Sequence, residues 1–446
     1  MTEASTASSK EGKFARRLGL IGATNIGLGA MLGGGIYVIS GTAAGIVGPA
    51  LILAYFATGA LTVFTALNYA ELAASIPKQG GGYTFAAETF GGFPGFLTGW
   101  FLFIGNIVAC GLYALAVAHT FVAIIPSWSS SDVGIIAIII ILVTFATNIV
   151  SIKGVSNVLS ILNIIQSFVL FSFIFIGLVF IQPSNLDPFI PEFVGIPQFM
   201  TAVSFIYISF VGFELITTAS EEIKEPAKNI PRAIVLTLGI ATVVYMAASL
   251  ILVGVTSYTT IADSNTPIAD VYGIMLGAPA LYIGLAGMAA SNYAALNATF
   301  LATARVAYSM GRDRYFPIFL DRVHSKFRTP IPALVVTLIL VSFFALPGDV
   351  SLVASLADFG YLIGLAIVNV SVIMLHRKGL SVPGTFRAPL FPLIPILGAI
   401  TCILLVPSLH FETLVLGGLL SLFGLVVYGL YGGQRNRTYV RRINSE

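Results

Sequence analysis

The chain has 446 residues, of which 57% are hydrophobic and 9% are charged, and its mean hydropathy is +0.96. Soluble domains carry about 25% charged residues, so this composition excludes a soluble enzyme, a disordered chain and a disulfide-stapled secreted domain. The two cysteines, Cys110 and Cys402, lie in apolar runs and indicate neither a structural disulfide nor a thiolate metal site. The sequence therefore predicts an integral membrane protein that is embedded in a lipid bilayer.

Twelve runs along the chain are apolar and about 20 residues long, as a membrane-spanning helix requires. Before them, residues 1–17 are polar and are expected to form a disordered cytoplasmic tail. The first run lacks a cleavable signal peptide's features. Between the seventh and eighth runs, the polar stretch 257–272 is long enough for a small interfacial helix. The runs are expected at 18–46, 49–74, 93–125, 133–150, 156–181, 197–218, 232–256, 277–307, 331–346, 351–375, 389–407 and 413–431.

The basic residues predict the orientation. In this twelve-span arrangement all 22 lysines and arginines fall on one side, including those of a basic tail at 432–446. Basic residues concentrate in cytoplasmic connections, so both termini are predicted to lie in the cytoplasm, with the protein in the plasma membrane. An error of one span would scramble the segregation. The opposite connections contain only the acids Asp132, Asp187, Glu192, Asp263, Asp270, Asp349 and Glu412.

A glycine run in the first span, Gly33, Gly34 and Gly35, predicts an interrupted helix. Each interior glycine costs a helix about 1 kcal/mol relative to alanine. Unwound backbone at membrane depth must be buried in protein or line a wet cavity. If the second half-helix begins near Gly34, its free N–H groups and positive dipole end can bind a carboxylate. The alternative is close helix packing through small residues.

The sixth span contains a similar irregularity, a glycine at Gly212 followed by Glu214. An intramembrane carboxylate is a functional candidate by default, although Glu214 could instead pin the helix by accepting backbone N–H groups. Interrupted spans at matching places in two halves point to a transporter site. Spans 1 and 6 each begin a run of five, in opposite directions. We therefore expect one five-helix repeat at 18–181, an inverted repeat at 197–375, and two further helices at 389–431.

Five stretches together resemble the amino acid–polyamine–organocation superfamily of permeases. They occur in family order and the resemblance extends from residue 18 to about residue 431. It implies an all-helical membrane fold like that of the leucine transporter, with a five-plus-five inverted repeat and broken helices 1 and 6. It also implies secondary active transport of amino acids, by symport or exchange. The stretches are 33–37, 69–85, 210–234, 304–313 and 386–392.

The resemblance also implies roles for individual residues. Gly33, Gly34 and Gly35 match the backbone seat for the substrate carboxylate. Ile208 stands where relatives often place an aromatic gate, and the pocket looks small and nearly uncharged, which favours a neutral amino acid. The carbonyl groups around Met31, Ile208 and Ser209 match the seat for the substrate ammonium; Asn106, Phe210, Gly212 and Thr299 are the other expected substrate-binding positions.

The coupling ion stays open between H⁺ and Na⁺. Some sodium-independent relatives carry a lysine in the fifth span, but the stretch 163–169 has none. Sodium could use carbonyl groups of span 1 together with span 8, but Ala294 and Ala295 there lack hydroxyls. Asp358 is either a proton carrier or a solvated residue near a helix start. Glu71 is expected to pair with Arg305 or Lys78. The coupling or gating candidates are thus Glu214, Asp358, Glu71 and Arg305.

Other functions receive less support. The four histidines are scattered without paired spacing and predict no metal site; His119 reads as structural, and His324, His376 and His410 as water-facing. No cluster of catalytic side chains indicates an enzyme, and nothing points to a cofactor or to nucleic acid. Neither a P-loop nor a soluble domain is present for ATP-driven transport. The main alternative to a carrier is a channel or amino acid sensor with the same fold.

Overall fold

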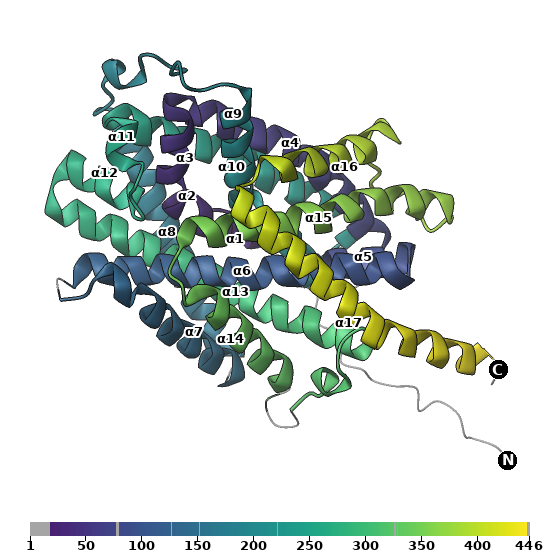
Figure 1. Ribbon diagram of the computed structural model, residues 1–446. Coiled ribbons are helices and arrows are strands. Elements are labelled where there is room, and N and C mark those ends of the chain that lie inside the picture. The colour runs from purple at the N-terminus through teal and green to yellow at the C-terminus, as the bar shows by residue number, and fades with distance from the viewer. Residues whose placement is uncertain are drawn as a thin grey trace.

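The computed structural model describes residues 18–76, 80–125, 127–150, 152–220, 222–324, 327 and 329–443, and it is built from helices (Figure 1). Within these ranges there is no strand, only an isolated bridge between Leu18 and Ile223. Helices suit a bilayer because each one satisfies its own backbone hydrogen bonds. The expected tail at 1–17 lies outside the described residues.

Eight helical stretches of the described chain are long and apolar enough to cross a membrane. A bent pair, α9 (Ile196–Phe205) and the 3-10 segment after it, makes a ninth if counted as one span. The eight are α1–α2 (Leu20–Met31 and Gly34–Val38), α3–α4 (Ser40–Val47 and Leu51–Ser75), α6 (Gly92–Ile124), α7 (Val133–Val150), α8 (Ile152–Gly177), α10 (Pro226–Val255), α15 (Val350–Arg377) and α17 (Phe411–Ile443).

The helices therefore give eight or nine spans by length and composition, fewer than the twelve expected. The difference lies in three helices, α13 (Ala278–Arg312), α14 (Ile331–Ala345) and α16 (Leu393–Leu405). α14 and α16 are short. α13 has 35 residues, but its composition is too polar for it to count as a membrane-spanning helix. Its polar residues Ser291, Asn292 and Asn297 are nevertheless buried in the protein.

The connections contain helices of their own. The expected interfacial helix at 257–272 is replaced by two, α11 (Tyr258–Ile261) and α12 (Pro267–Leu276). A further helix, α5 (Gly81–Thr89), precedes α6 and was not expected. At the other end of the chain, α17 continues helically to Ile443 through most of the segment expected as a basic tail.

Helix α6 forms the centre of the bundle, and α17 lies on its outside (Figure 1). In their most apolar stretches, 94% of α6 is buried, compared with 17% of α17. Helices α13 and α15 pack along α6. Small residues permit this contact: a Cβ on Gly360 of α15 would lie 2.8 Å from the backbone nitrogen of Gly105 in α6. The core is therefore assembled around helices that approach backbone to backbone.

Candidate functional site

The first span is interrupted at its glycine run. Helix α1 ends at Met31, and α2 begins at Gly34. Gly33 leaves the helical conformation, with ψ of −115°. The last carbonyl groups of α1 and the first N–H groups of α2 therefore have no partner within their own helices. Both kinds of group lie inside the protein, because Met31 and Leu32 at the end of α1 and Ile36 in α2 are buried.

The second interruption lies in the sixth expected span. After α9, the chain forms a short 3-10 helix, η4 (Tyr207–Phe210), and a second one, η5 (Phe213–Ala219), and the stretch Tyr207–Thr217 is bent by 43° relative to α9. Gly212 between them has φ of 135°, a conformation that residues with a Cβ rarely adopt. The Gly212 N–H donates to Glu214 Oε2 at 2.7 Å. Glu214 therefore accepts a backbone N–H group of this turn, as one of the two interpretations of this residue expected.

The two interruptions pack directly on each other. A Cβ on Gly35 would lie 2.6 Å from the Cα of Ser209. On the other side, a Cβ on Gly212 would lie 3.0 Å from the backbone of Ala30 and Met31. Glycine is thus required at both crossings, and the start of α2 meets η4 while the end of α1 meets Gly212.

Three neutral side chains from three other helices bind the carbonyl groups at the end of α1. Gln166 of α8 donates from Nε2 to Gly29 O at 3.3 Å, and Ser291 of α13 donates from Oγ to Leu32 O at 3.4 Å. The Tyr245 hydroxyl of α10 lies within hydrogen-bonding distance of Met31 O, and 2.7 Å from Ser209 O. These donors are absent from the site expected from the sequence. The signal for them in the sequence is a polar side chain within an apolar run, which gives no direction for that side chain.

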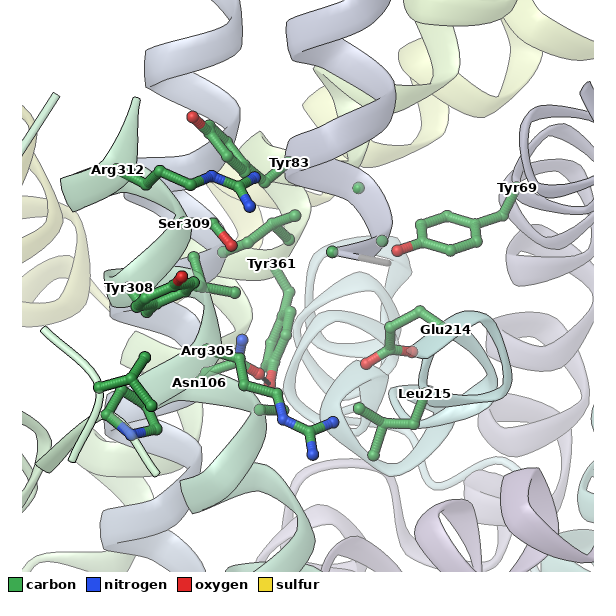
Figure 2. Close-up of a pocket in the computed structure, with 18 residues that line it drawn as sticks. Tyr69, Tyr83, Asn106, Glu214, Leu215, Arg305, Tyr308, Ser309, Arg312 and Tyr361 are labelled. Atoms are coloured by element: carbon green, nitrogen blue, oxygen red, sulfur yellow. Dashed lines mark hydrogen bonds between the residues drawn. The ribbon is translucent and has the colours of Figure 1, made fainter. Parts of the chain in front are cut away.

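A cavity of about 340 Å³ lies beside the second interruption (Figure 2). Three expected residues line it: Asn106, Glu214 and Arg305. Figure 2 shows Glu214 and Arg305 reaching into it from opposite walls, η5 and α13. Asn106 Oδ1 accepts a hydrogen bond of 2.7 Å from the hydroxyl of Tyr361, which also lines the cavity. Its volume is at the small end of the range for ligand sites.

The other expected substrate positions do not line the cavity. Ile208, Ser209, Phe210 and Thr299 are buried, and they are not among the residues that line it. The cavity therefore reaches one side of the second interruption through Glu214 and Leu215, without opening between the two broken helices.

Asp358 is fully buried on α15, two turns past the helix start, so its interpretation as a solvated residue is wrong. Asp349 is the residue at that start, where it caps the N–H of Leu352 at 2.9 Å. Within the described ranges, neither carboxylate oxygen of Asp358 makes a hydrogen bond. It lies close to the backbone amide of Ile208 in η4.

Glu71 pairs with His376 rather than with Arg305. Its Oε1 lies 2.6 Å from His376 Nε2, and its Oε2 accepts the Ala388 N–H at 2.8 Å. His376 was expected at a water-facing edge. It is largely covered, because the segment before α16 folds back over it and the Phe391 ring stacks on the imidazole at 4.2 Å. The other expected partner, Lys78, lies outside the described residues. Glu71 is thus part of a contact between α4, α15 and this segment, away from the cavity.

Comparison of the chain with known proteins identifies its family. The family model described as amino acid permease matches residues 18–429. The chain is 30% identical to the branched-chain amino acid permease BcaP of Bacillus subtilis, over 97% of this chain and 96% of that protein. It is 28% identical to the methylthioribose transporter of the same organism, over 96% of each chain. Cationic amino acid transporter 4 of Mus musculus is 26% identical, over 85% of this chain and 62% of that protein.

Proposed function

Because the chain belongs to the amino acid permease family, within the amino acid–polyamine–organocation superfamily, we propose that it is a secondary active amino acid transporter working by alternating access. The observation that carries this proposal is the crossing of two interrupted helices in the interior of the bundle. One broken end offers N–H donors and the other offers carbonyl acceptors. This pair of groups matches the two charges of an amino acid zwitterion.

The proposed topology has twelve spans, with both termini in the cytoplasm of a plasma-membrane protein. Adding α13, α14 and α16 to the nine candidate spans gives this number. The polar residues of α13 are buried, so its low hydropathy is compatible with a span in the middle of a bundle. Interruptions in the first and sixth spans support the inverted repeats at 18–181 and 197–375.

The substrate is a neutral amino acid held by both interruptions. Gly33, Gly34 and Gly35 at the start of α2 receive its carboxylate, and the carbonyl groups of Met31, Ile208 and Ser209 receive its ammonium. Branched-chain amino acids are the first candidates, because two of the similar proteins are named as their permeases. The side chain of the substrate lies toward Phe210, Gly212, Thr299 and Asn106, which carry no charge.

The cavity is the path by which substrate reaches the cytoplasm. Arg305 and Arg312 line it, and they belong to the side on which the basic residues concentrate. The direct contact between Gly35 and Ser209 closes the proposed amino acid site. Release then requires the interrupted helices to separate toward Glu214, on the cavity side.

The proposed coupling ion is H⁺, carried by Asp358. A buried carboxylate without a partner is costly, so this group takes a proton or a cation from its surroundings. Within the described ranges no lysine, arginine or histidine forms an ion pair with it. Sodium is disfavoured because Ala294 and Ala295 of α13, at the aligned positions of span 8, have no hydroxyl group to bind it.

Reconstitution into liposomes tests the proposal. Vesicles loaded with unlabelled leucine should take up labelled leucine by counterflow, saturably, and isoleucine and valine should compete better than lysine. Unsaturable flux without counterflow would indicate a channel. A thermal shift with leucine but no flux would indicate a sensor. Strong competition by methylthioribose alone would contradict an amino acid substrate.

A further inference from the structure

We propose that the hydroxyl of Tyr245 is a third acceptor for the substrate ammonium, beside the carbonyl oxygens of Met31 and Ser209. The inference rests on the proposed function and assigns a substrate contact to α10, a helix from which no residue of the site was expected. It makes Tyr245 a specificity-determining residue for primary amines.

The three oxygens form one cluster between the interrupted helices. The Tyr245 hydroxyl contacts Met31 O at the end of α1 and lies 2.7 Å from Ser209 O in η4. All three residues are buried, Met31 to 1% exposure and the other two completely. The cluster is therefore shielded from bulk water.

The number of hydrogens in the cluster leaves it short of donors. A tyrosine hydroxyl carries one hydrogen and two lone pairs, and each carbonyl oxygen carries two lone pairs. Tyr245 can donate fully to only one of its two carbonyl neighbours, Met31 O or Ser209 O. One hydrogen among three oxygens leaves spare acceptor capacity on every one of them. A primary ammonium brings three N–H donors and a positive charge, which is the group that this cluster lacks.

The ring of Tyr245 fixes where its hydroxyl lies. It packs edge-on against Phe210, with ring centroids 5.1 Å apart, and the tilted ring of Tyr55 lies 5.4 Å away. Phe210 belongs to the second interruption. Rotation of the ring away from the carbonyl groups is thus opposed by packing, and the hydroxyl stays in the cluster whether or not an ammonium is present.

The chain offers a matched control at Tyr37. This tyrosine of α2 is also fully buried, and its hydroxyl donates to a backbone carbonyl, Gln166 O, at 2.9 Å. Tyr37→Phe therefore removes a hydrogen bond of the same kind from an interrupted helix, but it removes no oxygen from the cluster. A loss due only to weakened packing of the broken helices should affect Tyr37→Phe and Tyr245→Phe alike.

The test compares leucine with 4-methylpentanoate, which is leucine without its ammonium, as competitors of labelled leucine counterflow. In the wild type, leucine should compete far better. In Tyr245→Phe this preference should fall about tenfold, the factor for one hydrogen bond to a charged group. In Tyr37→Phe the preference should stay at the wild-type value. An equal preference in all three proteins would overturn the proposal.

A measurement on the wild type alone keeps the proposal testable if Tyr245→Phe folds poorly. N-methyl-leucine has a secondary ammonium with two N–H donors for three acceptors, so it should compete about tenfold less well than leucine. Equal competition would overturn the role of a third acceptor while leucine counterflow upheld the proposed function. Absence of leucine counterflow in the wild type would overturn both.

Discussion

Gly35 packs directly against Ser209, and this contact joins the two interrupted helices. An added Cβ on Gly35 would lie only 2.6 Å from Ser209 Cα, a separation that real Cβ atoms essentially never show. Because the neighbouring atom is backbone, no side-chain rotation can relieve the overlap. The binding site proposed for an amino acid therefore lies between two chain segments that can approach this closely only because residue 35 has no Cβ.

The first prediction concerns that missing Cβ. Gly35→Ala should reduce leucine counterflow by a factor of about 5 to 150, because overpacking of this kind costs about 1–3 kcal/mol and pushes the interrupted helices apart. Gly239→Ala is the matched control. Gly239 lies in the interior of α10 with open space where its Cβ would go, so this variant should transport normally. Normal counterflow in Gly35→Ala would remove the contact from the mechanism.

Asp358→Asn should separate accumulation from exchange. The amide resembles the protonated carboxyl but cannot release a proton. Accumulation of leucine driven by an inward pH gradient should be abolished, whereas counterflow, which needs no net proton movement, should continue. Asp349→Asn at the exposed start of the same helix should keep both activities, because asparagine also caps a helix. Undiminished accumulation in Asp358→Asn would show that another group carries the coupling ion.

The interruptions could be predicted from the sequence because their cause is local. Gly33, Gly34 and Gly35 weaken the helix in which they stand, and Gly212 adopts a backbone conformation that favours glycine. The donors that bind the end of α1 could not be predicted in this way. Gln166, Tyr245 and Ser291 come from three other helices, and their directions depend on how those helices pack.

The same distinction explains the error about the partner of Glu71. The partner of Glu71 depends on how the segment before α16 folds back, which places Ala388 and Phe391 around His376. Helix α13 is a different case. A helix forms where the sequence predicted one, although its composition is too polar for a membrane-spanning helix by hydropathy alone. Buried asparagines and serines reduce its hydropathy, because it faces protein on most sides.

Glu214 should tolerate loss of its charge better than loss of its oxygen. Glu214→Gln keeps an acceptor for the Gly212 N–H and should retain more than half of the wild-type uptake. Glu214→Ala leaves that N–H without its acceptor, which costs about 1–3 kcal/mol, and it should lower both thermal stability and uptake. Equal loss of uptake in the two variants, with stable protein, would show that the carboxylate charge is needed for transport.

The Glu71–His376 contact should contribute to stability rather than to substrate recognition. His376→Ala removes one partner of a fully buried carboxyl group and should destabilise the protein by about 1–3 kcal/mol, measured by thermal unfolding in detergent. Adding Glu71→Gln should recover part of this loss, because the two side chains contact each other directly. The affinity for leucine should not change. Strictly additive effects would contradict the coupling.

The central claim, that two interrupted helices hold both charged groups of an amino acid, is tested most directly by competition of leucine counterflow with analogues that lack one charge each. Leucine methyl ester keeps the ammonium, and 4-methylpentanoate keeps the carboxylate. Both should compete at least a hundredfold less well than leucine. Competition by either analogue as strong as that of leucine itself would contradict the claim.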